Sequence, residues 1–116
     1  IPFKKALDDG CDKLIVVLTQ PRGFVKRYGK YDKMGARMLG HKYPEIKRVI
    51  MERPDRYNAV VKECEALAKE GKVMILRPNH LLNSFESDVR KLEMAYWHGY
   101  RMTKEKVKKI KRFIEE

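Results

Sequence analysis

The spacing of hydrophobic and polar residues along the chain predicts a mixture of helices and two short strands. A short apolar stripe closed by Gly10 indicates a first helix. The continuous apolar run Leu14–Leu18 follows it and is typical of a strand covered on both faces. A second apolar run, 72–76, predicts another strand that ends at Arg77-Pro78.

Between the two strands, apolar residues recur every three to four positions, which predicts two or three helices. The first ends at Tyr43-Pro44, because the residue before a proline is pushed out of the α region. Pro44 opens a short helix, and Pro54 separates it from a longer one that runs from about 55 to 70. The inner face of the longer helix is formed by Tyr57, Val60, Val61, Cys64, Leu67 and Ala68.

After the second strand, two more helices are predicted. One begins at about Glu86, where Glu86 and Asp88 complement the helix dipole. Thr103 is the predicted cap of a separate final helix. The side chains expected to face inward are Val89, Leu92, Tyr96 and Tyr100 in the first helix, and Val107, Ile110 and Phe113 or Ile114 in the second.

The order of elements predicts an α/β fold with two short parallel strands and about five to six helices. We interpret residues 1–116 as one segment made of a helix and buried strand (1–22), a basic loop with helices (23–71), a strand (72–78) and C-terminal helices (79–116). Two strands make a poor sheet by themselves, so we expect the chain to be a piece of a larger α/β fold.

Charge narrows the classes of partner. Among 116 residues, 27 are Lys or Arg and 16 are Asp or Glu, which gives a net charge of +11 and favours anionic partners. Bases and aromatic rings interleave between residues 22 and 43, a pattern that suits a lipid headgroup boundary or single-stranded nucleic acid, or equally core residues beside solvated cations. The candidate membrane or anion contacts are Lys26, Arg27, Lys30, Lys33 and Arg37.

A catalytic or metal-binding constellation is missing from the sequence. Ser84 and Ser87 lie outside any glycine-flanked elbow, and the three histidines lack the ligand spacing of a metal site. We therefore predict no cofactor and no metal. Two cysteines, no signal peptide and no membrane-length apolar run indicate a cytoplasmic protein, peripheral to the membrane if its basic surface binds lipid.

The carboxyl ends of the two strands are the candidate ligand site. In open α/β sheets ligands bind beyond these ends, so parallel strands would bring six residues to one edge. Arg77 has an alternative role, which is to neutralise a nearby acid or a helix carboxyl end. The six candidates are Thr19, Gln20 and Arg22 after the first strand, and Arg77, Asn79 and His80 after the second.

A set of short motifs, in order along nearly the whole chain, resembles the C-terminal part of bacterial patatin-like phospholipases. These motifs are Ile1-Pro2, Ala6, Gly10, Asp12, the VVLTQP strand end with Gly23, Tyr43-Pro44, Arg56-Tyr57-Asn58, Gly71 with Arg77-Pro78, and Gly99-Tyr100. The resemblance implies a three-layer α/β/α fold, present here in part. It also implies hydrolysis of lipid acyl esters by a serine–aspartate dyad.

In that family, the serine elbow lies well upstream of the matched part, and the aspartate turn immediately precedes the segment that resembles Ile1-Pro2. No dyad residue therefore maps onto this chain, and we predict that the chain alone is inactive. The expected partners are a lipid or anionic membrane surface, the missing N-terminal part of its own fold, and a second copy through an exposed sheet edge. Nucleic acid is not expected, since no recognisable motif supports it, and a stand-alone basic nucleic-acid-binding module is the alternative function.

Overall fold

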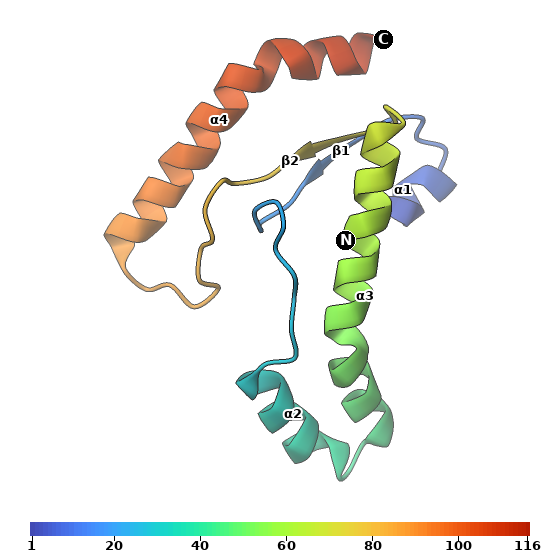
Figure 1. Ribbon diagram of the computed structural model, residues 1–116, viewed down its shortest axis with the longest axis vertical. Coiled ribbons are helices and arrows are strands. Elements are labelled where there is room, and N and C mark those ends of the chain that lie inside the picture. The colour runs from blue at the N-terminus through green and yellow to red at the C-terminus, as the bar shows by residue number, and fades with distance from the viewer. The chain divides into compact units, whose positions relative to one another are not determined.

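The computed structural model describes residues 1–116 and contains four helices and one sheet of two strands (Figure 1). The elements are α1 (Phe3–Asp8), β1 (Leu14–Val17), α2 (Lys30–Gly40), α3 (Pro44–Lys69), β2 (Val73–Leu76) and α4 (Val89–Glu115). The predicted α/β class is confirmed. The expected five to six helices are four, because two predicted helix breaks are absent.

The first missing break is at Pro54, which lies inside the continuous helix α3. A proline removes one backbone hydrogen bond, but the surrounding turns carry a ladder of side-chain pairs that supports the helix. Arg48 bonds Glu45 at 2.8 Å and Glu52 at 3.4 Å, and Arg56 bonds Glu52 at 2.7 Å. The Glu45 and Glu52 carboxylates raise the pKa of the Arg48 guanidinium. Pro54 is itself buried, so its ring packs rather than ending the helix.

The second missing break is at Thr103, which lies within α4 instead of capping a new helix; Figure 1 shows that α4 continues without interruption. The start of α4 also differs from the prediction. The Asp88 carboxylate accepts a hydrogen bond from the Arg90 amide at 2.9 Å, which makes Asp88 the N-cap. Glu86 lies before the helix, where its carboxylate accepts bonds from the amides of Ser87 and Asp88.

The two strands are parallel, as predicted, with Leu14 paired to Val73 and Val17 to Leu76. The ladder extends one residue further, since the Leu18 amide donates to the Leu76 carbonyl at 2.8 Å. Within this chain β1 is covered on one face only, and the expected cover of its other face stays a prediction for the larger fold. Val16 is buried but Val17 on the opposite face is 72% exposed, because only one face of β1 has cover within this chain.

Contacts between residues group the chain into two compact units. We call Ile1 with residues 25–63 the hairpin unit, and residues 2–24 with 64–116 the sheet unit. Most of the buried apolar side chains belong to the sheet unit, and Cys64 among them has no exposed surface, as its position in the predicted stripe implied. The buried apolar residues of the sheet unit are Phe3, Val16, Leu18, Cys64, Val73 and Leu76.

No helix combines the length and the apolar character that crossing a lipid bilayer requires.

Candidate functional site

The six predicted site residues follow the ends of β1 and β2, and the structure directs those after β2 to two different helices. Because the strands are parallel and in register, the segments that carry Thr19 and Arg77 leave the sheet at the same edge. Thr19 and Arg22 are exposed, and Gln20 is partly buried. The side-chain amide oxygen of Gln20, Oε1, is buried without a hydrogen-bond partner, so it is an unsatisfied acceptor close to the end of β1.

Arg77 faces the end of α3 rather than open solvent. Its guanidinium lies 2.9 Å from the Glu65 carboxylate, and its side chain is only 12% exposed. This ion pair is the alternative role that the sequence left open. Arg77 therefore holds β2 to α3, and the charge that it could offer a ligand is already opposed by a carboxylate.

Asn79 and His80 meet α4 through His98. The backbone amide of Asn79 donates to the His98 ring nitrogen Nε2 at 3.2 Å. The His80 and His98 rings lie 5.3 Å apart between centroids. Sequence spacing does not predict this pairing, because His98 lies eighteen positions after His80 and a loop lies between them. The contact fixes the loop after β2 against α4 and leaves no group of three or more metal-binding side chains together.

The sheet edge holds no nucleophile that a neighbouring base could activate. Cys64 is buried, and desolvation raises the pKa of its thiol, which disfavours the reactive thiolate. Ser84 and Ser87 lie in the loop before α4, where Asn83 and Glu86 use their side chains to bond backbone amides. Among these three side chains, none forms a hydrogen bond with a base that would activate it as a nucleophile.

The predicted basic contacts Lys26, Arg27, Lys30, Lys33 and Arg37 all lie in the hairpin unit. Two hydrogen bonds join the backbone of Lys26 to Asn58 in α3. The Lys26 backbone amide donates to the Asn58 side-chain oxygen at 2.8 Å, and the Asn58 side-chain NH₂ donates to the Lys26 carbonyl at 2.9 Å. Its ammonium lies 5.3 Å from the centre of the Tyr57 ring. The motif residues Tyr57 and Asn58 thus fasten the basic loop to the helix.

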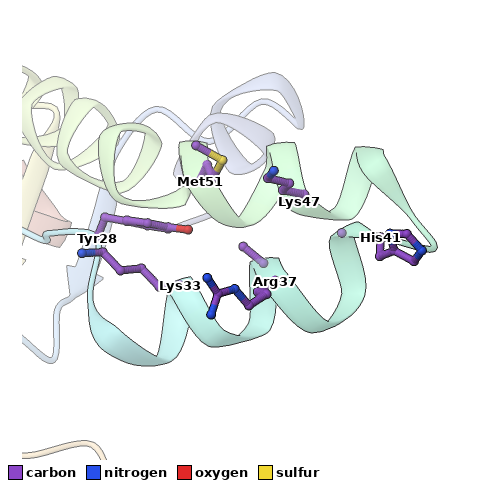
Figure 2. A pocket seen from close by; sticks show the side chains of 8 residues that line it. Tyr28, Lys33, Arg37, His41, Lys47 and Met51 are labelled. Carbon is purple, nitrogen blue, oxygen red and sulfur yellow. The ribbon is translucent and has the colours of Figure 1, made fainter.

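Two of these contacts, Lys33 and Arg37, line a pocket between α2 and the first turns of α3 (Figure 2). The pocket has a volume of about 430 Å³, and no acidic side chain lines it. The sequence predicts these two bases as anion contacts but not Lys47, the base on the α3 side of the pocket, because no spacing rule connects α2 to α3. The complete lining is Tyr28, Lys33, Ala36, Arg37, Gly40, His41, Lys47 and Met51.

Helix α4 carries a second surface that the sequence assigned wrongly. Most of the side chains predicted to face inward are exposed, whereas Ile110 and Phe113 near the end of the helix are half-buried, and no residue of α4 is fully buried. The correction has a simple cause: within this chain α4 touches only one neighbouring strand, β2, to an appreciable extent. Its open apolar face, spaced at the helical period, consists of Val89, Leu92, Tyr96, Tyr100, Val107 and Ile114.

Aromatic rings and bases surround this open face, which we call the α4 stripe. Trp97 makes edge-on contacts with Tyr96 and Tyr100, with ring centroids 5.3 and 5.7 Å apart. Lys104 lies 5.8 Å from the centre of the Tyr100 ring. Over its whole length α4 has nine Lys or Arg residues against three Glu. It is a basic amphipathic helix with its apolar face open.

Comparison with known proteins gives one match. No curated protein and no solved structure matches the chain. A family model described as a domain of unknown function, DUF6363, matches residues 43–115, a range that takes in the whole of α3, β2 and α4. Because this match covers more than half of the chain, the protein belongs to the DUF6363 family.

Proposed function

We propose that this chain is the C-terminal portion of a patatin-like phospholipase or esterase, and that it contributes a lipid-facing surface to that enzyme. The ordered motifs from Ile1-Pro2 to Gly99-Tyr100 support the family assignment. The parallel pair β1–β2 supports it as well, since parallel strands occur almost only in larger sheets with both faces covered. The exposed Ile15 and Val17 would then be covered by the N-terminal part of the same fold.

The observation that carries the lipid-facing role is the α4 stripe. An amphipathic helix with an open apolar face, aromatic rings and an excess of bases is the form that lies in the headgroup region of an anionic membrane. Rings such as those of Tyr96 and Trp97 favour that boundary, because one side is apolar and the other can bond water. The bases add attraction to anionic lipid.

Vesicle binding tests this role. The chain should co-sediment with phosphatidylcholine vesicles that contain phosphatidylglycerol, and much less with pure phosphatidylcholine. Tyr96→Asp with Tyr100→Asp should weaken binding by about ten-fold or more, because both rings leave the membrane and two charges enter the stripe. The matched control is Lys108→Gln with Lys109→Gln, which lowers the net charge equally but lies off the stripe.

The control variant distinguishes the contribution of the α4 stripe to vesicle binding from the contribution of net charge. If the two lysine substitutions weaken binding as much as the two tyrosine substitutions, general electrostatic attraction explains the binding and the stripe does not. A steep salt-dependent gel shift with RNA, without vesicle binding, would instead support the nucleic-acid-binding alternative.

The enzymatic half of the proposal has its own test. The chain alone should show no serine-dependent hydrolysis of a short-chain nitrophenyl ester, because it has no dyad. The encoded sequence before Ile1 should contain a G-x-S-x-G elbow and a D-G-G or D-G-A turn, and a protein that includes both should hydrolyse the ester. Absence of these motifs, or hydrolysis by the chain alone, would contradict the proposal.

A further inference from the structure

We propose that the pocket between α2 and α3 binds a phosphate group that belongs to a small organic phosphoester. This inference goes beyond the lipid-facing role of α4, because it concerns the hairpin unit and a defined site in place of a surface. It depends on neither the upstream dyad nor the α4 stripe.

Unopposed positive charge is the first argument for the site. Lys33, Arg37 and Lys47 line the pocket, and none of them forms an ion pair with a carboxylate of the chain. Three acids of the same unit have partners outside the pocket. Glu45 and Glu52 bond Arg48 and Arg56, and the Asp32 carboxylate accepts the Gly29 amide at 2.9 Å at the start of α2.

The kinds of donor present suit a phosphate. Figure 2 shows the Arg37 guanidinium and the Tyr28 hydroxyl extending from opposite sides into the space between the two helices, with Lys47 on the α3 wall. A guanidinium can bond two phosphate oxygens at once, while an ammonium acts as a point charge and a hydroxyl adds one further donor. His41 lies at the turn between the two helices, at the end of the pocket lining away from Tyr28.

The size and the remaining wall indicate a phosphoester rather than a bare phosphate ion. A volume of about 430 Å³ exceeds what a single phosphate fills. Ala36 and Met51 supply apolar surface beside the cations, and this surface can contact the organic part of the ligand. A glycerol phosphate unit, either free or as a lipid headgroup, has this combination of charge and carbon.

Two backbone features hold the cationic walls in place. A Cβ on Gly40 would lie 2.8 Å from the Lys47 Cβ, so only a glycine there allows α2 to approach the lysine this closely. The paired hydrogen bonds between Asn58 and the Lys26 backbone fix the loop two residues before Tyr28. The pocket is therefore built by contacts between segments and not by flexible side chains alone.

Binding of glycerol 3-phosphate, followed by calorimetry or by NMR titration of the full chain, tests the site. We expect saturable binding, and Arg37→Gln and Lys47→Gln should each weaken it by about ten-fold. The matched controls are Arg53→Gln and Lys62→Gln, which remove the same charges from exposed positions outside the pocket. Each control should change the affinity by less than about two-fold. Circular dichroism checks that the variants fold equally.

Two further arms identify the source of the phosphate. Vesicles with phosphatidic acid are compared with vesicles of equal surface charge that contain oleate, whose anion is a carboxylate. Loss of binding in Arg37→Gln only with phosphatidic acid would assign a lipid headgroup, whereas loss only with soluble glycerol 3-phosphate would assign a free phosphoester. No saturable binding of either ligand, or equal weakening by the control substitutions, would overturn the proposal. Hydrolysis by the longer protein would be unaffected by that result.

Discussion

The two long helices of this protein have the same sequence pattern and opposite surroundings. Helix α3 has 26 residues and α4 has 27, and both repeat apolar residues every three to four positions. In the C-terminal half of α3, from Tyr57 to Ala68, the stripe is partly or fully buried and includes the fully buried Cys64, whereas Ile46 and Val49 in the N-terminal half are exposed. In α4 the corresponding side chains are open, and Tyr96 is 64% exposed.

The different burial of the two faces shows that helical periodicity identifies an apolar face but not what covers it. The face of α3 lies against other parts of this chain near Cys64 and Glu65. The face of α4 from Val89 to Tyr100 is exposed, whereas Phe113 near its C-terminal end contacts Lys13, and we propose a lipid surface for the exposed part. Substitutions in the covered face of α3 and in the exposed face of α4 test whether the two faces differ in this way.

The largest contrast should come from placing a lysine in each stripe. Cys64→Lys should lower the free energy of unfolding by about 3 kcal/mol or more, because it buries an unpaired charge in a filled site close to Arg77. Val107→Lys in α4 should change it by no more than about 0.5 kcal/mol. Urea unfolding followed by circular dichroism measures both. If Val107→Lys proves as costly as Cys64→Lys, the α4 stripe is covered within the chain.

A smaller effect should come from the ion pair that anchors α3 to β2. Arg77→Gln should cost about 1–2 kcal/mol, since its nearly buried guanidinium would no longer pair with Glu65. The double variant with Glu65→Gln should lose less than the sum of the two single variants. Lys72→Gln is the matched control, because its pair with Glu70 is exposed and worth about 0.5 kcal/mol or less. Equal losses for Arg77→Gln and Lys72→Gln would contradict the anchoring role.

The smallest effect should be a local pH dependence at the start of α4. The Asp88 backbone amide is the main cause that lowers the pKa of Glu86 from its usual 4.5, and Lys91 and the Ser87 amide add to it. Because the folded-state pKa is lowered, the stabilisation by Glu86 is present above the unfolded value and is lost as the pH falls through the lower folded value. Acid should therefore fray the first turn of α4, as seen in amide exchange at residues 88–90.

The variant Glu86→Gln should remove this acid dependence, and Glu105→Gln in the middle of α4 should leave it in place. Unchanged acid fraying in Glu86→Gln would show that another group controls the start of the helix.

Local sequence signals predicted the strands and their direction well. The apolar runs Leu14–Leu18 and 72–76 are short, rich in branched residues and bounded by turn residues, and a helical crossover joins them. The buried position of Cys64 is predicted correctly for a similar reason, since its stripe is regular over about three turns. These features depend on neighbours in sequence, which a single chain displays.

Features that depend on distant neighbours could not be predicted. Pro54 is a different case: proline ends many helices, so the sequence predicts a break there, but the Arg48 and Arg56 pairs that support the helix across it have i,i+3 and i,i+4 spacing and are a local signal for a continuous helix. Lys47 joins the anion pocket only because Gly40 lets α2 come close. The exposure of α4 depends on cover, which sequence periodicity does not report.

The pairing of β1 with β2 also has a consequence for how the protein is made. Leu14 must find Val73, and the whole of α2 and α3 lies between them in the chain. During synthesis β1 leaves the ribosome long before β2 is made. Until then the apolar run Leu14–Leu18 is not paired with β2 and is prone to aggregate. Sheet closure is therefore a late step in folding, and slow translation before residue 76 would lengthen the time in which β1 is open to aggregation.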